Sequence, residues 1–267
     1  MIDFLRFYRV RGWGRKLPFI RFLGYPLLGM AVGPKEGFPS FPFLLYLVDG
    51  LAVSGILAFS YALNDYFDFV LEGDVNYVGE CIRVGRLTPR QVLLLLLVPL
   101  LFFLPSFLLP RPSFLLLSLF LCLSLLYSLP KLRMNRRVKM KFFLSPLSAF
   151  LLTLQALLLS GAPSAPSLGL LLLVFLFHYY VNSFHHLEEG GGWEGFLRLF
   201  PLLSFLLSLP LSLFLNSFFL LSSFFSLLRL GWVGGKDFFA LRSRPFGPPL
   251  FSEEFVGYVL LGMMGVL

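Results

Sequence analysis

Three carboxylates with helical spacing, Asp65, Asp68 and Glu72, are the residues of this chain best placed to do chemistry. They lie at the end of a long apolar segment in the run NDYFDFVLE, and their i, i+3, i+7 spacing puts them on one helix face, with Tyr61 about one turn earlier. Such oxygen ligands suit Mg²⁺, which commonly binds through one or two carboxylates plus substrate phosphates. The pattern predicts a diphosphate site in the membrane. The alternative is a solvated helix end, although three carboxylates on one face repel each other unless a cation lies among them.

Two more acidic residues flank this cluster. Glu72 is followed by glycine, which is common directly after the last turn of a helix, so we expect Asp74 to lie in the loop and off the ligand face. Asp49 is the only acidic residue placed in the interior of a predicted span and not at its first residue, or it is a helix-end residue if that span begins later.

A second polar cluster ends another apolar segment, in the run HYYVNSFHHLEE over 178–189. On a helix Asn182, His185, His186 and Glu189 share one face. Two helices that leave the membrane on the same side with polar faces at the same depth can bind one ligand between them. The alternative is an ordinary histidine pair at a helix surface. With three histidines in the whole chain, the histidine-rich motifs of membrane di-iron enzymes are excluded, and no zinc-protease or nucleophile motif is present.

A third feature is the basic run YSLPKLRMNRR over 127–137. Its Tyr-Ser-x-Pro entry lies where an apolar segment ends, which favours a role at the membrane surface. Read without that entry, it is a basic loop on the cytoplasmic side of a membrane protein.

The elements that position these residues are predicted to be membrane-spanning helices. The chain has 267 residues, 57% of them hydrophobic and 13% charged, with a mean hydropathy of +0.83. This composition indicates an all-α, polytopic transmembrane bundle forming a single domain over 1–267. We expect about nine spans, at 17–32, 42–63, 91–109, 113–129, 142–160, 167–187, 199–213, 214–230 and 254–267.

The basic residues indicate how the spans are oriented. With a cytoplasmic N-terminus, all but Lys35 and Arg111 of the 22 lysines and arginines fall in segments assigned to the cytoplasm. The polar clusters then lie on the cytoplasmic side. The net charge of +8 has this topological explanation, and no basic–aromatic platform for nucleic acid is visible. A transporter is disfavoured because the acidic residues gather at one side and not at mid-membrane.

Taken together, these motifs resemble the UbiA superfamily of intramembrane prenyltransferases. The family's NDxxDxxxD signature is similar to NDYFDFVLE, with Glu72 in the last place. The turn that follows it looks like IRVGRLT over 82–88, and the family's YSxPxx(K/R) loop is matched by YSLPKLR over 127–133. The second signature differs, because HHLEEGGGWEG over 185–195 contains no aspartate.

The resemblance implies a Mg²⁺-dependent transfer of a prenyl group from an isoprenoid diphosphate to an aromatic or lipid acceptor within the membrane. The metal ligands it implies are Asp65, Asp68, Glu72 and Glu189. The catalytic residues it implies are Asp65, Asp68, Tyr127 and Arg133, and the substrate-binding residues are Asn64, Tyr61, Lys131, Arg136, Asn182 and His186. The altered second signature leaves open a non-catalytic protein that binds an isoprenoid or a partner. The acceptor is not indicated by any motif.

Overall fold

In the computed structural model, the parts of the chain that can be described are all helical. They are residues 2–9, 25–26, 42–130, 138–160, 164–185 and 194–214, together with 220, 223–224 and 227, and they contain no strand. The helices are α1 Phe4–Phe7, α3 Pro42–Glu72, α4 Tyr77–Arg83, α5 Pro89–Leu101, α6 Arg111–Ser128, α7 Val138–Ser160, α8 Ala165–His185 and α9 Glu194–Phe214, with the 3₁₀ turn η1 at Leu104–Leu108. The all-helical fold class is therefore confirmed for this part of the chain.

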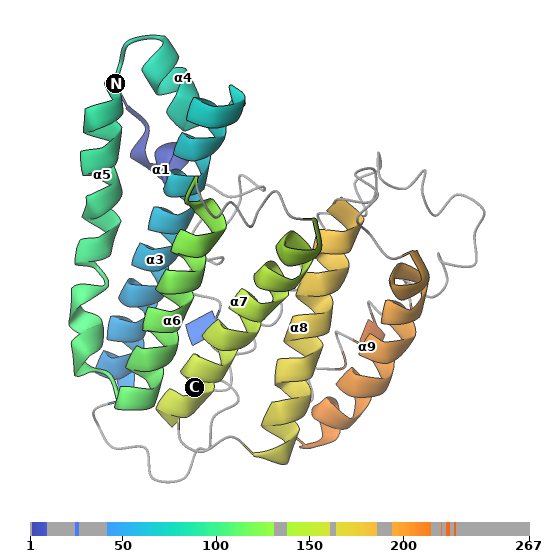
Figure 1. Cartoon of the computed structure of the whole chain (residues 1–267). Coiled ribbons are helices and arrows are strands. Elements are labelled where there is room, and N and C mark those ends of the chain that lie inside the picture. Colours follow the sequence, from blue (N-terminus) through green and yellow to red (C-terminus); the bar gives the residue numbers. More distant parts are fainter. Residues whose placement is uncertain are drawn as a thin grey trace.

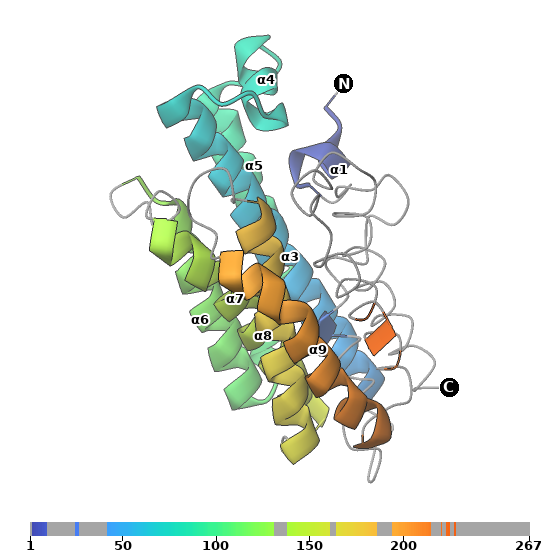
Figure 2. The same ribbon diagram turned by 90° about the vertical axis from the view of Figure 1, so that its right-hand side faces the viewer.

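The long helices lie side by side in one bundle (Figure 1). Helix α3 packs against α5, α6 and α7, and the series continues through α6–α7, α7–α8 and α8–α9 contacts. The short helices α1 and α4 contact each other and lie together at one end of the bundle, beside the C-terminal end of α3 (Figure 2). The bundle thus presents one capped end, where the acidic run lies.

Three stretches are long and apolar enough to cross a membrane: Leu44–Glu72, Pro89–Leu108 and Arg111–Ser128. Shorter apolar helices follow at Phe143–Leu159, Ser167–Tyr180 and Leu199–Phe214. These six match the second to seventh predicted spans. Apart from residues 25–26, the predicted span 17–32 lies outside the described residues, as do the span 254–267 and most of 214–230.

Two boundaries differ from those predicted. The predicted span ended at residue 63, whereas the apolar stretch long enough to cross a membrane runs to Glu72, the last residue of α3. The stretch predicted as 91–109 is a helix that ends at Leu101 and then tightens into η1, where Pro105 can donate no backbone hydrogen bond.

The connection over 73–90, which follows the second predicted span, contains the short helix α4. Asn76 caps its N-terminus, accepting a hydrogen bond from the Gly79 amide at 2.8 Å. Gly79 also lets α4 approach α3: a Cβ there would lie 2.2 Å from the ring of Phe69. The following helix α5 starts with a capping box between Thr88 and Gln91.

Two buried clusters divide the core along α3. One joins its N-terminal half to α6, α7 and α8 around Ile56, Leu117 and Leu152. The other lies under the capped end and packs α3 against α4 and α5, with Phe7 from α1 fully buried in it. The N-terminal segment is thus an integral part of the end that carries the acidic run.

Candidate active site

The acidic run lies on the last three turns of α3. Asn64, Asp65, Asp68 and Glu72 are all within this helix, which confirms that they are presented with helical spacing. The helix ends where Gly73 adopts a φ of +72°, a left-handed conformation that glycine takes without strain. Its amide hydrogen bonds to the Phe69 carbonyl at 2.9 Å, closing the final turn. The sequence-based helix stop is thus confirmed, and with it the place of Asp74 beyond the helix.

Asp65 forms an ion pair with Arg9 from the N-terminal segment. Arg9 Nε donates to Asp65 Oδ2 at 2.9 Å, and Nη2 donates to Oδ1. The Asp65 side chain is only 4% exposed, whereas that of Arg9 is 39% exposed. The guanidinium also lies over the ring of Tyr61, 5.8 Å from its centroid. Both carboxylate oxygens of Asp65 are therefore occupied by one arginine.

The backbone and the charge of Arg9 both reflect this contact. Its φ of +50° lies in the left-handed region, which a side-chain-bearing residue adopts at a cost of about 1 kcal/mol. Desolvation of the guanidinium acts to lower its pKa, but the charge of Asp65 and the hydrogen bond outweigh it and raise the pKa above its ordinary value. Arg9 is thus a permanent positive charge at the end of α3.

Further contacts among α1, α4 and α3 hold the segment that carries Arg9 beside Asp65. Asn76 Nδ2 donates to the Asp65 backbone carbonyl at 2.8 Å, so the residue that caps α4 also bonds to α3. The Tyr77 hydroxyl accepts from the Asp3 amide at 2.8 Å, and Arg6 lies over the Tyr77 ring at 4.5 Å. The segment that carries Arg9 is therefore anchored on α4 at several points.

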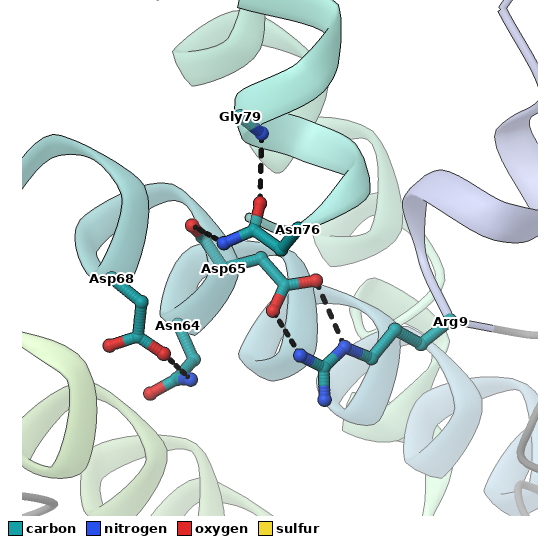
Figure 3. A network of polar contacts seen from close by, with 6 residues as sticks. All are labelled: Arg9, Asn64, Asp65, Asp68, Asn76 and Gly79. Carbon is teal, nitrogen blue, oxygen red and sulfur yellow. Dashed lines mark hydrogen bonds and ion pairs between the residues drawn. The ribbon is translucent and has the colours of Figure 1, made fainter. Parts of the chain in front are cut away.

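Asp68, three residues further along α3, directs its carboxylate away from Arg9 (Figure 3). Asn64 Nδ2 donates to its Oδ2 at 2.5 Å, one turn apart on α3. Figure 3 shows the Asp65 carboxylate directed at Arg9, and the Asp68 carboxylate with Asn64 directed away from it. Glu72 is exposed at the last residue of the helix. Asp65 is thus bonded to Arg9, and on the Asp68 side of the helix end the Asn64 amide is one partner of the carboxylate.

The side-chain oxygens on the Asp68 side suit Mg²⁺ if other ligands come from the substrate and from water. Within the residues that the structure describes, no three acidic, histidine or cysteine side chains are grouped closely enough to hold one metal ion. Mg²⁺ does not need such a group when substrate phosphates and water complete its shell. Asp68, Glu72 and Asn64 fit that partial role.

The remaining predicted site residues are placed only in part. Tyr127 lies in the last turn of α6 and is half-buried. Asn182 belongs to the helical backbone of α8, but its side chain is outside the described part. Lys131, Arg133, Arg136, His186 and Glu189 lie outside the described residues.

Two residue pairings at the site were not predicted from the sequence. Arg9 was counted only as one of the basic residues that set the topology, and no signal separates it from its neighbours in the sequence. His178 in α8 has its Nε2 3.0 Å from the hydroxyl of buried Tyr25, which joins the second polar segment to an N-terminal residue. Both pairings connect residues far apart in the chain.

Comparison with solved structures identifies the fold. No protein-family model matches the chain, and no curated protein is similar to it in sequence. A UbiA homologue from Archaeoglobus fulgidus bound to GPP and Mg²⁺ superposes with a TM-score of 0.68 at 18% identity, covering 98% of this chain and 99% of that one. The homologue bound to DMAPP and Mg²⁺ gives 0.64 at 17% identity, covering 99% of both chains.

A third similar structure comes from work on digeranylgeranylglyceryl phosphate synthase, with a TM-score of 0.57, 15% identity and coverage of 98% of this chain and 94% of that one. Identities this low establish the fold alone, and they do so over almost the full length of both chains. The resemblance seen in the sequence motifs is therefore confirmed at this level: the chain has the fold of the UbiA superfamily.

Proposed function

We propose that this protein is a UbiA-type prenyltransferase that moves a prenyl group from an isoprenoid diphosphate to a hydrophobic acceptor within the membrane, with Mg²⁺ as cofactor. The observation that supports this most directly is the end of α3, where Asn64, Asp68 and Glu72 gather oxygen donors beside the Arg9–Asp65 pair. The similar structures whose titles name GPP or DMAPP with Mg²⁺ share this fold.

Each proposed role follows from the chemistry of the side chain. Asp68, Glu72 and Asn64 would hold Mg²⁺, which neutralises a diphosphate and stabilises it as a leaving group. Lys131, Arg133 and Arg136 would add positive charge around the diphosphate. Tyr61 and Tyr127 would face the allylic cation, which aromatic rings stabilise. Asn182 in α8 would complete the site together with His186 and Glu189, which follow that helix in the sequence.

The role of Asp65 in the proposed site differs from the one that the motif implies. The resemblance implies that it is a metal ligand, whereas the geometry has both of its carboxylate oxygens bonded to Arg9. We propose that Asp65 acts through this pair, holding the N-terminal segment against α3. A metal would have to compete with the guanidinium for the same oxygens.

We further propose a single membrane domain over 1–267 with a cytoplasmic N-terminus and with the active site facing the cytoplasm. The distribution of lysine and arginine along the chain supports this orientation. The capped end of the bundle, with α1 and α4, would then lie in the cytoplasm, and the prenyl chain would extend between the helices into lipid.

The altered second signature supports one other candidate, a non-catalytic protein that binds an isoprenoid diphosphate. Its run HHLEEGGGWEG offers glutamate and histidine where the family has aspartate. Such a protein would bind the diphosphate with Mg²⁺ without breaking its allylic C–O bond.

One experiment separates the two. Purified protein in detergent is given radiolabelled geranylgeranyl diphosphate, Mg²⁺ and a panel of quinone precursors, lipid alcohols and tetrapyrroles, and both prenylated product and pyrophosphate are measured. A product that requires Mg²⁺ and is lost in Asp68→Asn supports the transferase. Mg²⁺-dependent binding of the diphosphate with no pyrophosphate release supports the binder, and no binding at all by folded protein contradicts both.

A further inference from the structure

An acidic residue that the proposed function does not use lies inside the bundle. Asp49 is fully buried on α3, two turns after the helix begins at Pro42. It therefore lies inside the candidate membrane span Leu44–Glu72 and not at the end of the helix. At 1.5 Å per residue it lies about 24 Å along the helix from Asp65, far from the acidic run. An ionisable residue at such a place needs a specific partner.

That partner is Gln155 on α7, which is also fully buried. Gln155 Nε2 donates to Asp49 Oδ1 at 2.5 Å. The other oxygen of each side chain, Asp49 Oδ2 and Gln155 Oε1, has no hydrogen-bond partner. They are two of the three such buried side-chain atoms in the described part of the chain.

If Asp49 is ionised, neither Asp49 Oδ2 nor Gln155 Oε1 can find a hydrogen-bond donor in this pair. A carboxylate only accepts hydrogen bonds, and so does the amide oxygen. Turning the amide over exchanges its nitrogen and oxygen but still leaves one acceptor on each side chain unpaired. A buried carboxylate without a compensating cation is also very costly in an apolar interior.

No described side chain supplies that cation. The buried cluster that contains Val48 and Ala52, which flank Asp49 on α3, is formed with side chains of α6, α7 and α8, and η1 also packs on α3. In α8, the His178 ring nitrogen Nε2 lies 3.0 Å from the Tyr25 hydroxyl and has no ion pair with Asp49. Arg111 at the start of α6 is exposed and makes no ion pair with Asp49. Over 143–160 α7 contains no ionisable residue, and neither does η1.

We propose that Asp49 carries a proton and forms an acid–amide pair with Gln155 in the interior of the bundle. The Oδ2 hydroxyl then donates to Gln155 Oε1 while Oδ1 accepts from Nε2, so that one proton satisfies both unpaired atoms. The pair joins α3 to α7 with two hydrogen bonds and no net charge. The Ser113 hydroxyl of α6 approaches the backbone carbonyl of Gln155 at 3.4 Å, at the same point on α7.

Infrared spectroscopy of the intact protein in detergent at neutral pH tests the proton directly. The wild type should show the carbonyl stretch of a protonated carboxylic acid, shifted by exchange into D₂O only slowly because the group is buried. Asp49→Asn should lose this band, whereas Asp74→Asn, which alters an exposed loop residue, should keep it. A wild-type spectrum without the band, or a band unaffected by Asp49→Asn, would overturn the proposal.

Thermal unfolding of variants tests the pairing. Asn at position 49 can still accept from and donate to Gln155, so Asp49→Asn should leave the midpoint nearly unchanged. Gln155→Leu removes the hydrogen-bond partner of Asp49 and should lower the unfolding midpoint by several degrees. The double variant Asp49→Leu/Gln155→Leu should recover part of this loss, because no polar group then remains unpaired. Thr153→Val is the matched control on α7, since the Thr153 hydroxyl bonds only within its own helix, to the Ala149 carbonyl at 2.8 Å.

Two outcomes of the same series would contradict the neutral pair. One is a loss of stability in Asp49→Asn as large as in Gln155→Leu, which would require a charged Asp49. The other is a midpoint that rises with Na⁺ relative to choline at equal ionic strength in the wild type but not in Asp49→Asn, because a bound cation would then take the place of the proton.

Discussion

Arg9 and Asp65, 56 residues apart in sequence, are joined by two hydrogen bonds at the end of α3, where the helix carries its acidic run. The contact brings an N-terminal residue into the candidate active site and occupies both oxygens of the first aspartate. It adds to the contacts that Asp3 and Arg6 make with Tyr77 of α4 at this end of the bundle. We therefore expect the stability of the capped end to be coupled to the proposed site through this ion pair.

Breaking this ion pair should destabilise the protein. Arg9→Gln leaves the buried Asp65 carboxylate without its partner, and we expect a loss of about 1–3 kcal/mol in the free energy of unfolding, below the range for fully buried pairs because Arg9 is partly exposed. The double variant Arg9→Gln/Asp65→Asn should lose less than the sum of the single variants. Thermal or denaturant unfolding in detergent measures these differences.

Arg6→Gln is the control for that series. Arg6 lies 3.9 Å from Glu80 in an exposed pair, which is worth at most about 1 kcal/mol. If Arg6→Gln were as damaging as Arg9→Gln, the effect would come from general docking of α1 and not from the Asp65 pair.

Asp68 is predicted to be the carboxylate that matters most for transfer. Asp68→Asn keeps the shape of the side chain but removes the charge that would hold Mg²⁺, so the rate of prenyl transfer should fall by about 100-fold. Asp74→Asn should change little, because Asp74 lies beyond the helix end. Glu72→Asp restores the usual residue of the family and should be tolerated. Full activity in Asp68→Asn together with loss in Asp74→Asn would place the metal site on the loop instead.

The close approach of α4 to α3 depends on Gly79. A Cβ at this position would lie 2.2 Å from Phe69 Cδ2 and 2.9 Å from its Cβ, so Gly79→Ala must push the two helices apart. Overpacking of this kind costs about 1–3 kcal/mol, and it should weaken the Asn76 contact to Asp65 as well. Unfolding experiments measure the loss.

Gly85→Asn is the comparison for that variant. Gly85 has a φ of +70° with no atom within 4 Å of a built Cβ, and asparagine tolerates this conformation. It should cost little. Equal losses in both variants would mean that backbone conformation, and not the contact with Phe69, determines the effect.

The proposed orientation predicts which connections are accessible from the cytoplasm. In a background with Cys81 and Cys122 replaced by serine, Val75→Cys should react with a membrane-impermeant maleimide only from the cytoplasmic side, since Val75 is 85% exposed at the capped end. Arg111→Cys, at the first residue of α6, should react only from the other side. Labelling of inverted and right-side-out vesicles checks both, and the reverse pattern would invert the topology.

The sequence alone determined the helical class of the chain and the local geometry of the acidic run. A long run of apolar residues predicts a helix from a short stretch of sequence, so helices were observed near the places of the second to seventh predicted spans. The spacing of Asp65, Asp68 and Glu72, and the helix stop at Gly73, are also local properties that a short sequence window carries.

The tertiary structure alone decided which partners those residues have. Arg9 is one of many basic residues near the N-terminus, and nothing in its neighbours indicates that it reaches Asp65. Gln155 lies 106 residues from Asp49, in a stretch that reads as an ordinary apolar helix. Such pairs form because packing brings particular helix faces together and buried polar groups must then be satisfied by whatever faces them. A periodic pattern shows that a face is buried, but only the packed bundle shows what that face meets.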